Sequence, residues 1–237
     1  MRWVRDNTGR FTQRPHFEPR ELDVDSENIV GEFLGRKYSK VHFPVLTDDL
    51  CLLVEECTDD LDYVDLPDGI FGVTEFMTGR RPSVRISKAL SDNPRMENPL
   101  RTTLTHELGH VRFHGPIWEL EEQSPRLFDV KKPGGHRHES HRDRILGGSE
   151  NIDWMEWQAG YISGALLMPF SVLKEHVSEF RKERGITASL MPGTPHTDEL
   201  IDVVSSNFRV SRDAARVRLS QLSCIVNDPR AYSIAWS

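Results

Sequence analysis

The segment His106-Glu107-Leu108-Gly109-His110 places the tightest constraint on how this chain can fold. Residues four apart lie on one face of an α-helix, so in a helix both imidazoles can reach a single metal ion. Leu100, Leu104 and Leu108 form an apolar line with the same spacing, which buries that helix in a core. Asn98-Pro99 has the residue types of a helix start. The sequence therefore predicts a buried helix that begins at Asn98 and runs through the motif.

The chemistry available to this helix is that of a catalytic metal centre. Zn²⁺ needs three protein ligands and an open position, and His106 and His110 supply two ligands. Glu107 lies about 100° further round the helix, so its carboxylate can approach a water on the metal without being a ligand. The metal would lower the pKa of that water to about 7, and Glu107 would pass its proton to a leaving amine. The simpler alternative is a helix that carries two exposed histidines near a glutamate.

A third ligand has to come from elsewhere in the chain, and Glu156 is the best downstream candidate. It lies on a helix that we expect to begin at Asp153 and to end at Pro169. The spacing Asp153-x-x-Glu156 is also that of a capping box, in which the glutamate bonds the first backbone amide of the helix. Spacing alone therefore leaves Glu156 either as a metal ligand or as part of a cap.

Two segments together, TLTHELGHVRFH and DWMEWQAGYISGALLMP, resemble the ImmA/IrrE family of metallopeptidases. That family has a His-Glu-x-x-His helix, followed by a Glu-x-x-Ala-Asn helix that ends in Leu-Leu-Met-Pro. The resemblance covers roughly residues 100–169 and extends loosely to the flanking helices. It implies that His106, His110 and Glu156 bind zinc and that Glu107 is the general acid and base. Gly160 stands where the family commonly has Asn, so a bond made by that Asn to a ligand would be missing or replaced.

Accessory roles are open to four further residues. Three histidines lie in residues 115–152, a stretch punctuated by Pro and Gly that we expect to be a long insertion or loop. They could form a lid with a transition-state donor, a second metal site or an anion-binding patch, and a solvated loop is the simpler alternative. A tyrosine five residues after Glu156 could lie near the metal or simply pack in the core. These four residues are His136, His138, His141 and Tyr161.

The rest of the pattern predicts an α+β protein. We expect an irregular arm over 1–20 and a metallopeptidase domain over 21–170, with zincin-like helices packed on a small antiparallel sheet of about three strands. Helices are predicted from Ser26 and from Thr47. A helical subdomain follows over 171–237, and its segment 198–222 has the pattern of a helix-turn-helix.

Composition narrows the cellular setting and the kinds of partner. The 237 residues carry 30 Lys and Arg against 37 Asp and Glu, which argues against binding nucleic acid through bulk charge. No stretch approaches the ~20 apolar residues of a membrane span, and no apolar run follows the charged start of the chain, as it would in a secretory signal. Three cysteines fit a reducing compartment. We therefore expect a cytoplasmic protein without a membrane partner.

The resemblance implies a specific function, which is one cleavage in a phage-type helix-turn-helix repressor that derepresses genes of a mobile element or a stress response. One alternative is a regulator that binds DNA or a repressor without cutting it, with the metal site structural or sensory. DNA contact through 209–222 is the weaker part of that alternative, because residues 171–237 carry nine basic against eight acidic side chains. A peptidase that acts on general peptides is a third possibility. Residues 1–170 are acidic, with 21 basic against 29 acidic side chains, which permits a basic protein partner.

Overall fold

The computed structural model describes residues 1–77, 79–123, 136–141 and 153–228. They form two compact units, a mixed unit of residues 1–22 and 47–163 and a helical unit of residues 23–46 and 164–237. Two of the three boundaries fall inside helices, one in α1 (Pro19–Tyr38) and one in α6 (Trp154–Leu167), and the third lies directly before residue 47. The sequence placed all of 21–170 in one domain. The structure instead assigns 23–46 to the helical unit, where the apolar face of α1 is buried.

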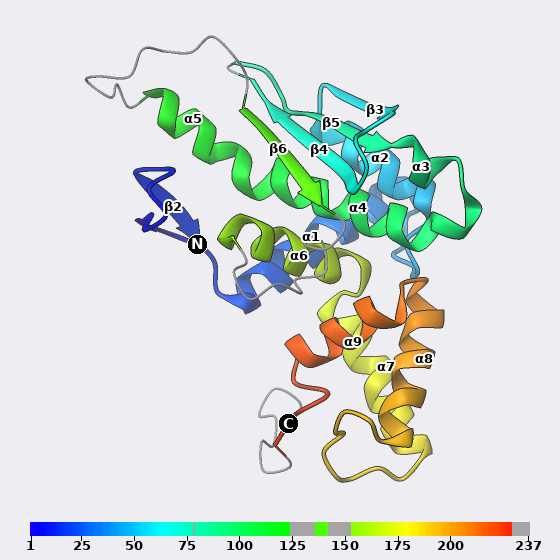
Figure 1. Ribbon diagram of the computed structural model, residues 1–237. Coiled ribbons are helices and arrows are strands. Elements are labelled where there is room, and N and C mark those ends of the chain that lie inside the picture. Colours follow the sequence, from blue (N-terminus) through cyan, green and yellow to red (C-terminus); the bar gives the residue numbers. More distant parts are fainter. Residues whose placement is uncertain (78, 124–135, 142–152, 229–237) are drawn as a thin grey trace. The chain divides into compact units, whose positions relative to one another are not determined.

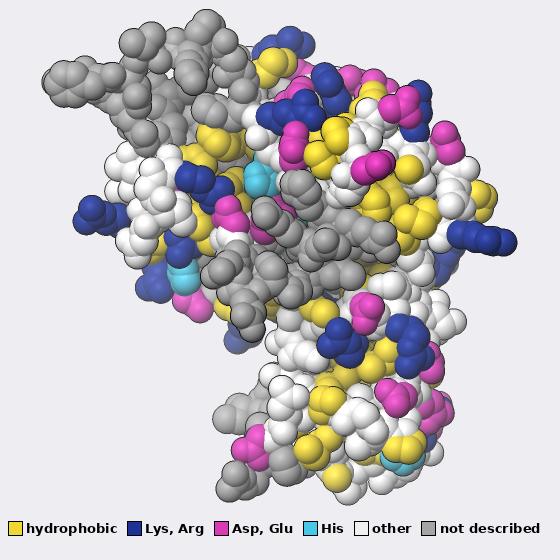
Figure 2. Space-filling view, viewed as in Figure 1, with side chains coloured by type: hydrophobic (Ala, Val, Ile, Leu, Met, Phe, Trp, Pro, Cys, Tyr) yellow, Lys and Arg dark blue, Asp and Glu magenta, His cyan; other side chains and the backbone are white. Residues whose placement is uncertain are grey.

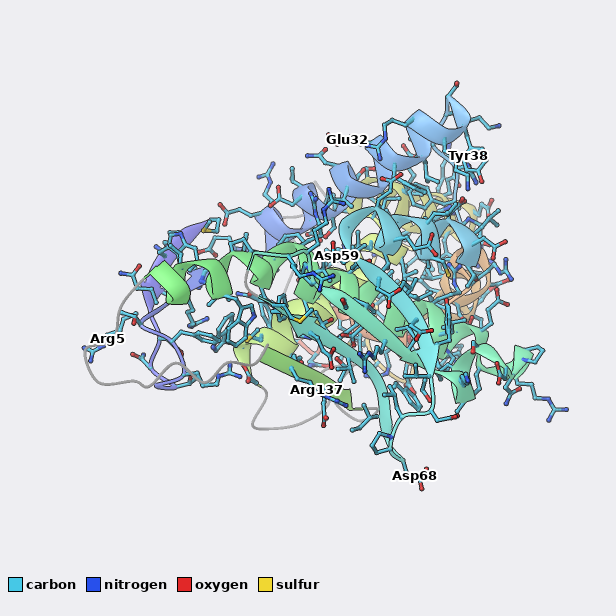
Figure 3. All side chains as sticks on the ribbon, turned by 90° about the horizontal axis from the view of Figure 1, so that it is seen from above. Arg5, Glu32, Tyr38, Asp59, Asp68 and Arg137 are labelled. Atoms are coloured by element: carbon cyan, nitrogen blue, oxygen red, sulfur yellow. The ribbon has the colours of Figure 1, made fainter. Side chains whose placement is uncertain are left out.

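The mixed unit contains a four-stranded sheet in the order β3 (Asp60–Val64), β5 (Ser83–Ser87), β4 (Ile70–Phe76) and β6 (His136–His141) (Figure 1). β4 is antiparallel to both of its neighbours, whereas β3 runs parallel to β5. Asp68 lies at the tip of the turn between β3 and β4 (Figure 3). The α+β class is confirmed, but the sheet is mixed and has a fourth strand. The expectation of three antiparallel strands was wrong because β5 inserts between the two strands that this turn joins.

β6 also corrects the prediction of one long loop over 115–152. Helix α5 (Gly115–Gln123) occupies the start of that stretch and β6 pairs with β4 further along. The apolar alternation that predicts a strand is missing from β6, whose residues are His, Arg, Glu and Ser. Residues 124–135 and 142–152 lie outside the described residues.

The helices of the mixed unit include α2 (Thr47–Cys57), α3 (Lys88–Ser91) and the motif helix α4 (Glu97–Gly109). A 3₁₀ turn, Pro94–Met96, leads into α4, and a π-helical turn, His110–His114, follows it. The expected start at Asn98 was therefore wrong. Asn93 caps the 3₁₀ turn instead, since its side chain accepts a hydrogen bond from the amide of Arg95 at 3.0 Å. The expected apolar line along α4 is buried as predicted.

The first residues form a hairpin of β1 (Arg2–Arg5) and β2 (Gln13–His16), not the irregular arm expected over 1–20. The Asp6 carboxylate closes the hairpin loop by accepting hydrogen bonds from the amides of Thr8 and Phe11, each at 3.1 Å. Phe11 is buried against Trp118 of α5, with ring centroids 4.8 Å apart. The hairpin thus depends on a side-chain-closed loop and on a remote helix, neither of which appears as an apolar period.

The helical unit consists of the part of α1 from Asp23 onward, α7 (Phe170–Glu183), α8 (Pro195–Phe208) and α9 (Arg212–Gln221). Ser26 is buried within α1 and does not begin it, contrary to expectation. α8 ends at Arg209 in the left-handed conformation, with φ at 52°. Ser211 then caps α9 by accepting from the amide of Ala214 at 3.1 Å, as the sequence predicts. No helix in the described part of the chain has the length and apolar character needed to cross a membrane.

A buried ion pair ties α9 to α1 within the helical unit. Nη2 of Arg218 lies 2.7 Å from Oδ1 of Asp23, and both side chains are largely excluded from solvent. Nε of Arg218 also donates to the backbone oxygen of Met168 at 3.1 Å. The guanidinium therefore joins three segments of this unit, and the carboxylate of Asp23 balances its buried positive charge.

Asp23→Ala tests this dependence. The substitution leaves the guanidinium of Arg218 buried without its carboxylate, so we expect the free energy of unfolding to fall by about 3–5 kcal/mol in urea denaturation. Asp202→Ala is the matched control, because Asp202 pairs with Arg212 at the surface, with 58% and 53% of the side chains exposed. It should cost less than about 1 kcal/mol. Equal, small losses for both variants would contradict a structural role for the buried pair.

Candidate metal centre

The candidate site forms where α4 and α6 pack closely together. An ideal Cβ on Gly109 would lie only 3.2 Å from the Cα of Ala159. Near the same contact the hydroxyls of Thr105 and Ser163 are 2.7 Å apart, and Ser163 donates to the backbone oxygen of Thr102 at 3.1 Å. Small residues on both helices thus let the backbones approach. This accounts for a glycine in the middle of the motif, despite its cost in a helix.

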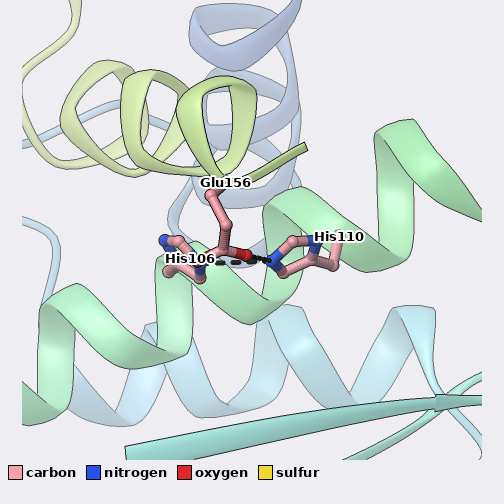
Figure 4. Close-up of side chains that lie close together, drawn as sticks. All are labelled: His106, His110 and Glu156. Atoms are coloured by element: carbon pink, nitrogen blue, oxygen red, sulfur yellow. Dashed lines mark hydrogen bonds and ion pairs between the residues drawn. The ribbon is translucent and has the colours of Figure 1, made fainter. Parts of the chain in front are cut away.

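This approach brings Glu156 of α6 to the two histidines of the motif (Figure 4). Nε2 of His106 and Nε2 of His110 are 3.1 Å apart. Oε1 of Glu156 lies 3.1 Å from Nε2 of His110, and Oε2 lies 3.7 Å from Nε2 of His106. In a tetrahedral site with bonds of about 2.0–2.1 Å, the ligand atoms are about 3.3 Å apart. The three side chains therefore have the spacing of ligands around one small cation.

Burial and hydrogen bonding also fit a cation at this point. The three side chains are at most 2% exposed. Oε2 of Glu156 has no hydrogen-bond partner among the described residues. Ring nitrogens and carboxylate oxygens that converge in this way repel one another unless a proton or a metal ion lies between them. The group therefore fits a metal ion, and its chemistry does not by itself identify which one.

Of the two roles open to Glu156, the structure favours contact with the histidines over a helix cap. Asp153 performs the capping by accepting from the amide of Met155 at 2.9 Å. Burial alone would raise the pKa of Glu156, but the close approach of the imidazoles of His106, His110 and His138 holds that pKa well below its usual range. Burial lowers the pKa of His110 well below its usual value. The site thus combines an ionised carboxylate with a buried imidazole whose neutral form is favoured.

Glu107 lies on the same helix but faces the sheet. Oγ1 of Thr74, on β4, donates to its Oε2 at 2.6 Å, while Oε1 has no partner among the described residues. An ideal Cβ on Gly72 would lie 2.3 Å from Oε1, so only glycine leaves space for the carboxylate at that strand position. Burial raises the pKa of Glu107, opposed by the charge of His106 and by the hydrogen bond from Thr74. Glu107 is therefore a buried carboxyl held at one oxygen and unpartnered at the other.

His138 is the one accessory histidine whose side chain the structure describes, and it reaches the site from β6. It pairs with Thr74 across the strands, on the sheet face that meets Glu107. Its Nε2 is hydrogen-bonded to Oε1 of Glu156, and its ring centroid lies 4.2 Å from that of His110. The side chain is 17% exposed. Burial lowers the pKa of His138, but the bond to Glu156 and the negative charges of Glu156 and Glu107 together outweigh this and leave the pKa raised.

Successive side chains of a strand lie on opposite faces of the sheet, so the neighbours of His138 on β6 do not reach the site. Arg137, labelled in Figure 3, and Arg85 lie 3.8 and 3.3 Å from the carboxylate of Glu75, on the opposite face of the sheet. His136 and His141 pair with Phe76 and Ile70 at the two ends of β6, and their side chains lie outside what the structure describes. Tyr161 is buried, and its ring centroid lies 5.6 Å from that of Trp157. A single register thus selects His138 for the site.

Two residues that the sequence did not single out for the site lie directly behind His110. Nδ1 of His110 is 2.9 Å from Nδ1 of His114, and Nε2 of His114 is 3.0 Å from Oε1 of Gln158. Nε2 of Gln158 donates to the backbone oxygen of Pro15, on β2, at 3.2 Å. Burial lowers the pKa of His114 to about 3, so the ring is neutral at physiological pH. The spacing of His114, four residues after His110, was the available signal.

Comparison with known proteins adds little to this picture. No family model and no curated protein matches the chain. Among solved structures, a Mycobacterium tuberculosis transcriptional regulator superposes with a TM-score of 0.48 and 15% sequence identity, over 89% of this chain and 48% of the regulator. The chain thus spans about half the length of that protein.

Gly72→Ala tests how tightly Glu107 is held. The added Cβ would meet Oε1 of a fully buried carboxyl that Thr74 already fixes. We expect the free energy of unfolding to fall by about 1–3 kcal/mol in urea denaturation. In a Glu107→Ala background the clash is absent, and the same substitution should cost much less.

Gly115→Ala serves as the control for Gly72→Ala. Its Cβ would meet only the ring of Phe76, at 4.0 Å, at the start of α5. Because alanine is favoured over glycine in a helix, this change should be neutral or stabilising by up to about 1 kcal/mol. Equal costs of Gly72→Ala with and without Glu107 would show that the carboxyl is not packed against Gly72.

Proposed function

We propose that this chain is a zinc-dependent metalloendopeptidase that makes a specific cleavage in a helix-turn-helix repressor of phage type. The observation that carries the proposal is the buried group of His106, His110 and Glu156, with Glu107 on the same helix. Two histidines and one glutamate are a ligand set of catalytic zinc sites, which keep a fourth position open. The order of the two sequence motifs supports the same conclusion.

The chain's own residues can perform the proton transfers of peptide hydrolysis. When bound, zinc supplies Lewis acidity, which activates a water and polarises the scissile carbonyl. Glu107 takes the proton of the attacking water on its unpartnered Oε1 and passes it to the nitrogen of the leaving amine. Thr74 fixes the other oxygen of Glu107, so that one carboxylate edge is held ready.

His138 is suited to bind the substrate carbonyl. It is the most solvent-exposed of the histidines around Glu156, and it carries N–H groups that can donate. A donor at this position stabilises the negative charge that develops on the carbonyl oxygen during attack. Of the three histidines in residues 115–152, His138 is thus the one that we assign the role of transition-state donor.

Charge pairing supports a protein substrate over DNA. On α9, Arg212 is paired with Asp202, and Arg216 lies 3.4 Å from Asp213. Arg218 is buried against Asp23. On the face of the molecule shown in Figure 2, basic side chains lie among acidic ones. Arginines that already have carboxylate partners are poorly placed to replace the counterions of a phosphate backbone.

The repressor as substrate comes from the family resemblance of residues 100–169. Cutting a DNA-binding repressor in the cytoplasm would derepress the genes that it controls, in a mobile element or a stress response. The non-cleaving regulator remains the competing function, and its defining property is stable binding without fragments.

Glu107→Gln separates binding from hydrolysis. The amide cannot accept the proton of water, so we expect cleavage to fall by at least about 10²- to 10⁴-fold, while zinc is retained on the three ligands. The measurement uses purified helix-turn-helix repressors encoded beside the gene, incubated with the zinc-loaded protein. Fragments are followed on gels and by mass spectrometry of the new amino terminus.

Glu139→Gln is the matched control, because it neutralises a carboxylate of β6 that is ion-paired with Arg137. It should cut at the wild-type rate. Cleavage by Glu107→Gln at the wild-type rate would overturn the mechanism. Co-elution of the wild-type protein with a repressor that stays intact in the presence of zinc would favour the non-cleaving regulator.

A further inference from the structure

We propose that Gln158 and His114 are positioning residues that hold His110 in the tautomer able to bind a metal ion, with its proton on Nδ1 and its lone pair on Nε2. The inference rests on the metal site of the proposed function and adds two residues to it. It is carried by a continuous chain of hydrogen bonds from the backbone of β2 to the ring of His110.

The direction of donation along this series of hydrogen bonds is fixed at Pro15. A backbone carbonyl oxygen only accepts hydrogen bonds, so Gln158 must present its NH₂ group to Pro15, across 3.2 Å. The amide oxygen of Gln158 consequently faces His114. The two ends of the Gln158 side chain cannot be exchanged without losing the bond to Pro15 and setting two carbonyl oxygens against each other.

The ring of His114 must therefore donate from Nε2, which lies 3.0 Å from the oxygen of Gln158. The ring is fully buried, and the partners that its two nitrogens contact in the described chain are an amide and a second imidazole. Neither partner carries the negative charge that a buried imidazolium would need. A neutral ring with its proton on Nε2 has its lone pair on Nδ1.

That lone pair determines the state of His110. The two Nδ1 atoms are 2.9 Å apart, so one of them has to donate, and only His110 can. A neutral His110 with its proton on Nδ1 carries its lone pair on Nε2. This nitrogen is the one that lies 3.1 Å from both Nε2 of His106 and Oε1 of Glu156. The series of hydrogen bonds thus leaves Nε2 of His110 as the free ligand atom, facing the site, before a metal ion binds.

The other histidine of the motif, His106, has no comparable hydrogen-bond partner behind its ring in the described chain. Nδ1 of His106 is buried and lacks a hydrogen-bond partner among those residues. The two motif histidines are therefore unequal, and His110 is the one whose orientation and tautomer are set in advance. Partners of this kind typically contribute 10- to 100-fold to metal affinity.

The tautomer of His114 can be read directly by NMR of metal-free protein labelled with ¹⁵N in its histidines. We expect Nε2 of His114 to carry the proton, Nδ1 to be bare, and a scalar coupling to join the two Nδ1 atoms across their hydrogen bond. A proton on Nδ1 of His114 would overturn the proposal. This readout requires neither bound metal nor cleavage, so its failure is distinct from a failure of the proposed function.

A pair of variants matched in size tests the consequence for the metal. His114→Leu removes the acceptor behind His110, and we expect zinc affinity, measured by competition with a chromophoric chelator, to fall by about 10- to 100-fold. His114→Asn keeps a carbonyl oxygen that can accept from Nδ1 of His110, and it should recover most of that loss. Equal zinc affinities for wild type, Leu and Asn would contradict the proposal.

Gln158→Met provides a second route if the leucine variant does not fold. It keeps the length of the side chain but removes the amide that polarises the chain of hydrogen bonds. His114 should then exchange between its two tautomers, which appears as averaged or doubled ¹⁵N resonances. A His114 spectrum identical to that of the wild type would show that Gln158 does not set the tautomer.

Discussion

The candidate site depends on the close approach of α4 and α6 at Gly109 and Ala159. A Cβ at 109 would lie 3.2 Å from the Cα of Ala159, so one of the two backbones would have to shift by a few tenths of an ångström. Glu156 reaches His106 and His110 only because its helix lies at this short distance. Hydroxyl bonds between Thr105 and Ser163 hold the same contact from the side. The close packing of small residues on α4 and α6 therefore sets the distances between the candidate ligand atoms.

Burial of these polar groups costs free energy unless each of them has a partner. Three imidazoles, those of His106, His110 and His114, and the carboxyls of Glu107 and Glu156 are withdrawn from water within one small region. Nε2 of His106, Nε2 of His110 and the carboxylate of Glu156 are directed at a common point, and Oε2 of Glu156 has no hydrogen-bond partner among the described residues. Polar groups buried in this way are costly unless every one is satisfied. A cation at the common point would satisfy these converging atoms, and this is the strongest physical argument for a metal ion here.

The sequence could predict the features that depend on residues only a few positions apart. The helical period placed His106 and His110 on one face, and the structure brings them together as expected. The role of Glu156 was left open because a capping box has the same spacing, and only the distance to α4 favours ligand contact. His138 could not be singled out, since its strand lacks an apolar period and pairing with Thr74 selects it. Gly72 and Gln158 act through residues far away in the chain, and no local pattern marks such contacts.

Metal analysis of crystals grown with zinc tests the central claim most directly. The account predicts one zinc per chain, with its anomalous peak between Nε2 of His106, Nε2 of His110 and the carboxylate of Glu156. It also predicts that His106→Ala loses the peak. A protein that binds no zinc, or one that binds zinc elsewhere while His106→Ala leaves the metal content unchanged, would contradict the account.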